Sequence, residues 1–342
     1  MKSYQPPLTL TPLMLTLVAD ISEQLGRLSA LMENSQTPML RRGNRIRTIQ
    51  ASLAIENNTL SLEQVTAVLD GRTVLGPPRE IQEVRNAFTA YEAMPDWHPG
   101  SRSHLLQAHA LLMLGLIDDA GQFRRSGVGI YRGDRLLHMA PPASRVATLM
   151  DDLLQWLERS EVHPLIASCV FHYEFEFIHP FADGNGRMGR LWQTLILSQW
   201  RPVLAYLPVE TVIRDQQDAY YGSLSAADQA AEATPFVEFM LGALKKSLCS
   251  VDQTAQVTAQ VTAQVSGSVI KLIQVLVSSP SLKTGELMHQ LGLAHRQSFR
   301  STYLNPALDA GLVEMTDPDS PRSPMQMYRL TEHGRALLQI TE

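Results

Sequence analysis

Apolar residues recur at helical spacing along most of the chain. The stretch 146–157 is the clearest case, because its apolar residues fall three or four positions apart and so share one helix face. Ser61 and Gln64 have the spacing of a capping box and predict a helix that ends near Gly71. Another helix is predicted after the proline pair that ends at Pro78. The pattern therefore predicts a mainly helical protein.

The N-terminal stretch is apolar from Leu8 to Val18, but Pro12 interrupts it and no small-residue cleavage site follows. Because the helical pattern continues to Leu28, we interpret the stretch as a helix and not as a signal peptide. The longest apolar run, residues 105–117, is too short to cross a bilayer. We therefore expect a cytoplasmic protein without membrane contact.

One segment departs from the helical pattern. Residues 127–139 contain two short extended runs around Gly133-Asp134, which is the sequence signal of a β-hairpin. Pro141 and Pro142 end the segment before the next predicted helix. We expect a single small hairpin in an otherwise helical region.

The pattern changes near residue 250. An uncharged Ala-Gln-Val-Thr/Ser unit occurs three times between residues 255 and 266, as either a short helix or a linker. Beyond it, helices are predicted at 269–277, 284–291 and 295–309, followed by two extended runs around a Pro/Ser/Asp turn. Three helices followed by a hairpin form the outline of a winged helix.

Composition narrows the class of protein. A chain of 342 residues with 44% hydrophobic and 18% charged residues is typical of a globular protein with two or three domains. A formal charge of −5 gives no general attraction to nucleic acid or to anionic membranes. Two cysteines, Cys169 and Cys249, are too few for a disulfide framework.

The segment from His179 to Arg190 carries the chemistry. An apolar helix precedes it, Pro180 must end or kink that helix, and a helical period resumes after Gly186. Gly184 allows a tight backbone path between the two helices. The predicted geometry is a loop that leads into a helix N-terminus, where unpaired N–H groups and a partial positive charge can hold a phosphate.

The side chains of this segment suit a nucleoside triphosphate. Arg187 and Arg190 are three positions apart on one helix face and can bind terminal phosphates. Asp183 offers an oxygen to a Mg²⁺ ion, Asn185 can donate to a phosphoryl oxygen, and His179 can take a proton. Each residue alone also has an ordinary structural interpretation, but together they predict a nucleotide site.

The segment resembles the signature of the Fic (filamentation induced by cAMP) family, His-Pro-Phe-x-Asp/Glu-Gly-Asn-Gly-Arg-x-x-Arg, at every fixed position. The resemblance implies an all-α Fic core with a small β-hairpin flap, followed by a winged helix-turn-helix domain. It also implies a protein adenylyltransferase that moves AMP from Mg-ATP to a Ser, Thr or Tyr hydroxyl of a protein and releases pyrophosphate.

Family roles follow by position. His179 would be the base, Asp183 the magnesium ligand, and Asn185, also expected to act in catalysis, would hold the α-phosphate with the amides after Gly184. The full set expected to bind the nucleotide is Gly184, Asn185, Gly186, Arg187, Arg190, Tyr220 and Tyr221, the tyrosines through a family position near the adenine. The hairpin sits where the family places its target-docking flap.

Ser52, Glu56 and Asn57 match an inhibitory motif that many Fic proteins carry, Ser/Thr-x-x-x-Glu-Gly/Asn. Four positions of separation place Ser52 and Glu56 on one helix face. If that helix packs on the site, Glu56 would pair with Arg190 and occupy the position of the γ-phosphate. An ordinary surface helix would show the same spacing.

The change of pattern near residue 250 and the resemblance together predict four regions: an N-terminal helical region with the inhibitory helix (1–100), the catalytic core (101–250), the repeat linker (251–268) and the winged-helix domain (269–342). Residues 265–342 hold seven basic and seven acidic residues, so DNA and protein, including a second copy in a homodimer, both remain open as partners. Other reactions also remain open, namely removal of AMP, transfer of another nucleotidyl or phosphoryl group, and self-modification. A DNA-binding regulator with a nucleotide-sensing core is the alternative outside enzymes.

Overall fold

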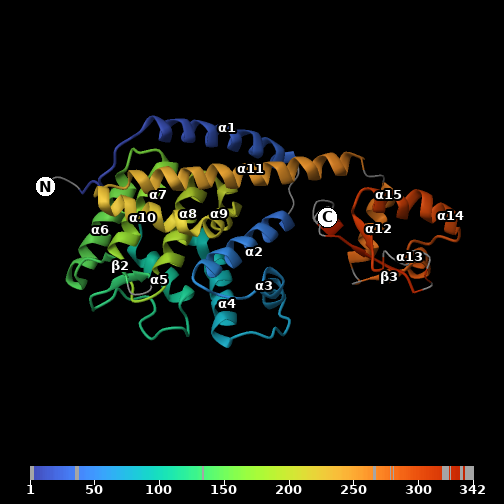
Figure 1. The fold of residues 1–342 in the computed structure, drawn as a ribbon, viewed down its shortest axis with the longest axis horizontal. Helices are drawn as coiled ribbons and strands as arrows, with labels where there is room; N and C mark the ends of the chain where they lie inside the picture. The colour runs from blue at the N-terminus through green and yellow to red at the C-terminus, as the bar shows by residue number, and fades with distance from the viewer. Residues whose placement is uncertain are drawn as a thin grey trace. The chain divides into compact units, whose positions relative to one another are not determined.

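The computed structural model describes residues 4–34, 38–132, 135–264, 267–277, 279, 281–317, 323, 325–331 and 334–335. The chain divides into two compact units, which are described separately. The first comprises Met1–Ser29 and Asn44–Cys249, and the second comprises Ala30–Gly43 and Ser250–Glu342. Figure 1 shows that helices dominate the chain. The prediction of a helical core with one small hairpin, followed by a further domain, is confirmed.

Up to the end of the repeat, the elements in chain order are α1 (Pro12–Asn34), α2 (Pro38–Ile55), α3 (Leu62–Leu69), α4 (Pro78–Ala93), η1 (Met94–Asp96), α5 (Arg102–Leu112), β1 (Gly129–Arg132), β2 (Arg135–Met139), α6 (Ala143–Arg159), α7 (Pro164–Ile178), α8 (Asn185–Trp200), η2 (Pro202–Tyr206), α9 (Val209–Asp215), α10 (Gln217–Ala230) and α11 (Thr234–Gln264).

Two helix starts follow the local signals in the sequence. Ser61 Oγ accepts a hydrogen bond from the backbone N–H of Gln64, and the Gln64 side chain accepts one from the backbone N–H of Ser61. This capping box begins α3, as predicted. Helix α4 begins at Pro78, where the missing N–H of proline leaves no helical bond unmade.

Helix α1 begins later than its apolar stretch. Pro12, which interrupts the apolar stretch, is the first residue of this helix, because proline is tolerated in the first turn. The buried residues Met14, Leu17 and Ile21 recur every three or four positions along α1. In Figure 1, α1 lies along α11, and Asp20 forms an ion pair with Lys245 of α11 at 2.6 Å.

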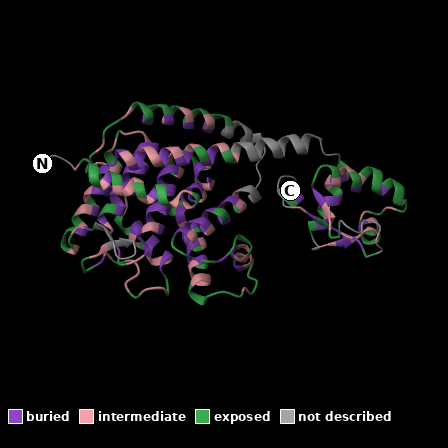
Figure 2. Ribbon diagram, in the orientation of Figure 1, coloured by how far each residue is buried: buried purple, intermediate pink, exposed green. Residues whose placement is uncertain are grey.

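Helices α7 and α8 form the centre of the first unit. Figure 2 shows them buried among their neighbours, and nearly every residue of α7 is buried. Phe171, Phe175 and Trp192 are fully buried, and each contributes about 1.5–3 kcal/mol to stability. A Cβ atom on Gly189 of α8 would lie 2.9 Å from the side chain of Glu176 in α7. The two helices can therefore approach closely only because this position is glycine.

The predicted hairpin is present as β1 and β2, which pair antiparallel with Gly129 opposite Met139. The register shifts between Ile130 and Tyr131. The predicted Gly133-Asp134 turn lies outside the described residues.

In the described part of the chain, every helix is too short or too polar to traverse a lipid bilayer.

The second unit is built from a small sheet and short helices. Its elements are α12 (Gly267–Val277), β3 (Leu282–Lys283), α13 (Thr284–Gln290), α14 (Arg296–Phe299), η3 (Arg300–Leu304), α15 (Asn305–Asp309), β4 (Val313–Met315) and β5 (Met327–Leu330). The strands pair antiparallel in the order β3-β5-β4. Strand β3 was not predicted, because two residues are too short to show an alternating pattern.

The third predicted helix of this unit is continuous but not uniform. Residues Arg300–Leu304 form a π-helical turn between α14 and α15. Pro306 follows this turn, lacks an N–H group and crowds the preceding carbonyls, so a widened turn accommodates it. The Ala-Gln-Val-Thr repeat, for which a helix and a linker were both open, forms the last turns of α11 as far as Gln264.

Candidate active site

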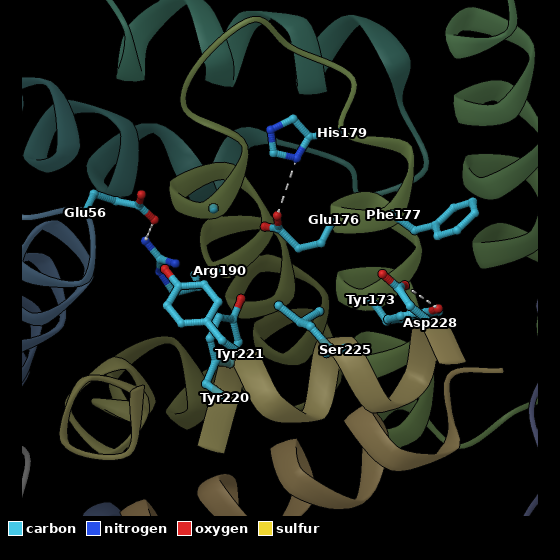
Figure 3. A pocket seen from close by; sticks show the side chains of 12 residues that line it. Glu56, Tyr173, Glu176, Phe177, His179, Arg190, Tyr220, Tyr221, Ser225 and Asp228 are labelled. Atoms are coloured by element: carbon cyan, nitrogen blue, oxygen red, sulfur yellow. Dashed lines mark hydrogen bonds and ion pairs between the residues drawn. The ribbon is translucent and has the colours of Figure 1, made fainter. Parts of the chain in front are cut away.

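The loop between α7 and α8 starts with an unusual backbone conformation at His179. This residue ends α7 with φ 49° and ψ 63°, in the left-handed region that non-glycine residues seldom occupy. Pro180 disfavours a helical conformation at the residue before it, so α7 cannot continue. This conformation at the end of α7 directs the imidazole of His179 toward a pocket, as Figure 3 shows.

The same loop ends with glycine at the start of α8. Gly184 has φ 84°, and a Cβ atom there would lie 2.6 Å from the sulfur of Met113. Both observations require glycine at this position. The first turn of α8 then presents backbone N–H groups that have no partner within the helix, which gives the loop the anion cradle predicted from the sequence.

One pocket collects side chains from α7, α8 and α10, together with Glu56 next to α2 (Figure 3). Its lining residues are Glu56, Tyr173, Glu176, Phe177, His179, Gly186, Arg190, Tyr220, Tyr221, Leu224, Ser225 and Asp228. Six of the predicted site residues are in this set: His179, Gly186, Arg190, Tyr220, Tyr221 and Glu56. The other five, Ser52, Asp183, Gly184, Asn185 and Arg187, lie next to it in the loop or on α2 and α8, but do not line it.

The pocket also contains residues that the sequence did not single out. Glu176 is the most informative, because its Oε2 atom lies 3.8 Å from Nδ1 of His179. The two residues are three positions apart, and that spacing is the only signal that pointed to the pair. A carboxylate beside the imidazole can hold the orientation of the ring.

The side chain of Asn185 stabilises the loop between α7 and α8. Its side-chain Oδ1 accepts a hydrogen bond from the backbone N–H of Phe181, and its Nδ2 donates to the carbonyl oxygen of Phe181, both at 2.9 Å. The side chain is buried. In this arrangement the side chain holds the loop closed, and the predicted donation from its amide group to a phosphoryl oxygen stays a prediction.

His109 of α5 supports the loop from the other side. Its Nδ1 accepts a hydrogen bond from the backbone N–H of Gly121 at 2.8 Å, so Nε2 carries the proton and donates to the carbonyl oxygen of Asp183 at 3.0 Å. The ring stacks on Phe181 with a centroid distance of 3.6 Å. Burial lowers the pKa of His109 to about 4. A neutral imidazole thus fixes the backbone that precedes Gly184.

Asp183 and Arg187 form an ion pair. Oδ1 of Asp183 accepts hydrogen bonds from the backbone N–H of Gly184 at 2.6 Å and from Arg187 Nη2 at 3.1 Å, and Oδ2 lies 3.4 Å from Arg79 Nη2. Arg187 also lies 3.5 Å from Glu83 of α4. Although Arg187 and Arg190 are three positions apart on α8, their guanidinium groups contact different partners.

A magnesium ion fits this region only if the phosphates of a nucleotide and water supply most of its ligands. Among the described residues, no cluster of three or more His, Cys, Asp or Glu side chains could hold a metal. Mg²⁺ is commonly bound by one carboxylate with phosphate oxygens and water. The side chain of Asp183 is 43% exposed and can serve as that carboxylate, in place of one of its arginine contacts.

Arg190 is held by the segment that carries the inhibitory motif. Its Nε donates to Ser52 Oγ at 3.0 Å, and its Nη2 donates to the carbonyl oxygen of Ser52 at 2.9 Å and to Glu56 Oε1 at 2.8 Å. Burial opposes the charge of Arg190, but Glu56, Tyr220 and Glu176 together outweigh it, and the pKa of the guanidinium is raised. The predicted pairing of Glu56 with Arg190 is present.

Glu56 also reaches the anion cradle. A Cβ atom on Gly186, in the first turn of α8, would lie 2.4 Å from Oε1 of Glu56. The carboxylate therefore lies against the helix N-terminus, where a negative charge is stabilised by unpaired N–H groups and by the helix dipole.

The two tyrosines differ in role. Tyr220 is buried, and its hydroxyl lies 3.2 Å from Nε2 of His172, whose Nδ1 lies 2.7 Å from Oε1 of Gln193. Burial raises the pKa of Tyr220 well above its usual value. Tyr221 is only partly buried and packs edge-on against Tyr220. Tyr220 is thus a core residue that also forms part of the pocket wall.

Profiles of known families match two parts of the chain. The Fic/DOC family profile matches residues 99–197, and the profile of the C-terminal domain of Filamentation induced by cAMP protein Fic-like matches residues 267–331. A crystal structure of a Fic family protein from Desulfovibrio desulfuricans G20 is 62% identical, with a TM-score of 0.75. The match covers 96% of this chain and 99% of that one.

Curated relatives are more distant. Protein adenylyltransferase Fic of Drosophila mojavensis is 28% identical over 283 residues, and that of Drosophila virilis is 30% identical over 241 residues. These matches cover 78% and 67% of this chain, and 54% and 47% of the relatives. The chain thus spans about half the length of the curated relatives it matches.

Proposed function

Because the chain belongs to the Fic family, we propose that it is a protein adenylyltransferase that transfers AMP from Mg-ATP to a Ser, Thr or Tyr hydroxyl of a protein and is inhibited by its own Glu56. One observation carries this proposal: His179, Arg190 and the first turn of α8 at Gly186 line a single pocket. A base, a cation and an anion cradle are the groups that nucleotidyl transfer needs.

His179 acts as the base in this proposal. The target oxygen forms a bond to the α-phosphorus of ATP, the bond from that phosphorus to pyrophosphate breaks, and the hydroxyl proton passes to the imidazole. Nδ1 of His179 faces Glu176 at 3.8 Å, so Nε2 is the nitrogen that takes the proton. Glu176 stabilises the imidazolium that forms, in the way that a carboxylate supports a catalytic histidine elsewhere.

The phosphates of ATP bind at the N-terminus of α8. The backbone N–H groups of the first turn hold the α-phosphate, and Arg190 and Arg187 bind the β- and γ-phosphates. A Mg²⁺ ion held by Asp183 would neutralise phosphate charge. Tyr221, at the edge of the pocket, is available to the adenine.

Glu56 is the proposed inhibitor because it takes the contacts that a terminal phosphate needs. Its carboxylate binds Arg190 and lies against Gly186. A γ-phosphate in this place would meet a carboxylate of like charge, so ATP would bind weakly or with its α-phosphate misaligned for in-line attack. Removal of the carboxylate should release both contacts.

The test is transfer by the Glu56→Gly variant. Mass spectrometry of this protein after incubation with Mg-ATP should detect AMP attached to the protein itself or to a co-incubated target, several-fold more than with the parent. Glu56→Gly with His179→Ala should give none. No increase in transfer over the parent would show that Glu56 is not the inhibitor.

Labelled ATP separates the rival reactions. Transfer of AMP places label from the α-phosphate on protein, whereas phosphotransfer places label from the γ-phosphate there. Removal of AMP would instead release AMP from a modified protein. Absence of any labelled protein from the Glu56→Gly variant would favour the nucleotide-sensing regulator.

A second candidate function concerns the C-terminal unit, for which we propose DNA as the partner. Arg296, Gln297, Ser298 and Arg300 are all exposed on α14 and at the start of η3, and residues 295–308 contain no acidic residue. Such a helix is suited to a DNA groove. Binding of the full chain to DNA should weaken with salt and with Arg296→Ala plus Arg300→Ala. Absence of binding at low salt would favour a protein partner or a homodimer.

A further inference from the structure

Arg124 joins the hairpin to the loop that carries the proposed base. It lies between α5 and β1, and only 3% of it is exposed. Its side chain donates four hydrogen bonds, all to carbonyl oxygens: from Nε to His179 at 2.7 Å, from Nη1 to Ser126 at 2.8 Å, and from Nη2 to Pro141 at 2.6 Å and to Ile178 at 3.2 Å.

Two of these bonds reach the C-terminal end of α7. The carbonyl groups of Ile178 and His179 have no helical partner there, and the end of a helix carries partial negative charge. The backbone N–H of Arg124 adds a bond to the carbonyl oxygen of Pro180 at 2.9 Å. Arg124 thus contacts three successive carbonyls around the left-handed residue His179, a conformation that persists only when its surroundings hold it.

The other two bonds reach both ends of the hairpin. Ser126 precedes β1 and Pro141 follows β2. The backbone N–H of Ala140 donates to the carbonyl oxygen of Val128 at 3.2 Å and closes the base of the hairpin. A single guanidinium therefore fixes the hairpin base and the His179 cap with respect to each other.

The environment of Arg124 suits this role. Burial lowers the pKa of its guanidinium, and its planar group offers five N–H donors in a fixed geometry. A lysine in the same place would offer one nitrogen and could not span carbonyls on both the hairpin and α7.

We propose that Arg124 is a positioning residue that aligns His179 with a target segment docked on the hairpin. This inference rests on the proposed AMP transfer. Arg124 does not line the pocket, so its loss should lower the rate of transfer without weakening ATP binding. A displacement of about 1 Å at a reacting group can reduce the rate by about a hundredfold.

The test compares Arg124→Ala, Arg124→Lys and Arg125→Ala in the Glu56→Gly background. Arg125 is the matched control, because it is exposed and its side chain donates to Gln122 Oε1 at 3.1 Å. Arg124→Ala should lower kcat for AMP transfer by about tenfold or more, with the KM and Kd for ATP changed less than about twofold. Arg124→Lys should be intermediate, and Arg125→Ala should match the background. A fall in ATP affinity equal to the fall in kcat, or no fall in kcat, would contradict the proposal.

A measurement that needs no activity separates the two proposals. The His179 ring resonance, identified in NMR spectra by its loss in His179→Ala, should shift in the Arg124 variants and not in Arg125→Ala. An unmoved resonance would contradict the positioning role even if transfer falls. If the Glu56→Gly background transfers no AMP, the proposed function fails, and this resonance still decides whether Arg124 positions His179. Should Arg124→Ala not fold, Arg124→Lys carries the same comparison.

Discussion

Nη2 of Arg190 donates a hydrogen bond to Oε1 of Glu56 over 2.8 Å, between a guanidinium that is 1% exposed and a carboxylate that is 34% exposed. Breaking a buried charge pair leaves the more buried partner without compensation. The guanidinium therefore needs an anion at this place, and a phosphate can replace the carboxylate. The contact that stabilises the resting protein is thus the contact that a nucleotide must take over.

Ser52 should also help to hold the guanidinium of Arg190 in the resting protein. Its hydroxyl accepts a hydrogen bond from Nε of Arg190 at 3.0 Å, so Ser52→Ala leaves a buried, charged donor without its acceptor. We expect a loss of about 1–3 kcal/mol in the free energy of unfolding. In the proposed function, AMP transfer should rise, but less than in Glu56→Gly. Urea unfolding and transfer assays measure the two effects.

Thr48 provides the control on the same helix. It lies one turn before Ser52, and its buried hydroxyl has no hydrogen-bond partner among the described residues. Thr48→Val keeps the shape of the side chain and removes an unpaired hydroxyl, so it should not lower stability and should leave transfer near the parent value. An equal effect of the two substitutions would show that Arg190 is not held through Ser52.

The sequence predicted the part of the site whose conformation depends on neighbouring residues in the chain. The loop from His179 to Arg190 takes its shape from Pro180 and Gly184, whose backbone preferences act at their own positions. The pairing of Glu56 with Arg190 was predicted from a family motif.

The sequence could not predict contacts that depend on tertiary packing. Arg124 and His109 hold the loop from outside it, and no motif marks them. The same limit applies to the ion pairs of Arg187 with Asp183 and with Glu83 of α4, which no motif indicated. In the second unit, the π-helical turn before Pro306 arises where a helical pattern contains a proline.

Glu210 should make stability depend on pH. It is buried near Arg45, Tyr91 and Arg190, and burial raises its pKa to about 7. Between its ordinary pKa of 4.5 and this value, the folded protein binds more protons than the unfolded chain, so the free energy of unfolding falls as pH rises. Stability from this group is fully present below pH 4.5 and is lost as the pH passes about 7.

Glu210→Gln removes this dependence. The free energy of unfolding of the variant, relative to the parent, should rise by up to roughly 3 kcal/mol between pH 5 and pH 8. Glu92→Gln is the control, because Glu92 is exposed on α4 beside Tyr91. A constant difference across this pH range would mean that Glu210 is ionised throughout it. Denaturant unfolding at each pH gives the values.

Gly186→Ala tests whether Glu56 and a phosphate share one place. The added Cβ would lie 2.4 Å from Oε1 of Glu56 and 3.1 Å from Nη1 of Arg190, so the carboxylate must move and its contact with Arg190 weakens. In the parent, we expect a loss of about 1 kcal/mol in the free energy of unfolding. In Glu56→Gly the nearer of these two atoms is absent, and alanine in a helix should instead stabilise by up to about 0.5–1 kcal/mol.

The decisive result is that Gly186→Ala lowers the free energy of unfolding in the parent but raises it in Glu56→Gly. Helix propensity alone would raise it in both proteins. The affinity for ATP provides a second test. The methyl group fills the cradle at the N-terminus of α8, so Gly186→Ala should weaken ATP binding even when Glu56 has been replaced by glycine. Thermal unfolding and calorimetric titration of the four proteins complete the cycle. If ATP binds the double variant as tightly as Glu56→Gly, the phosphates do not lie against Gly186, and Glu56 must inhibit by some means other than occupying their place.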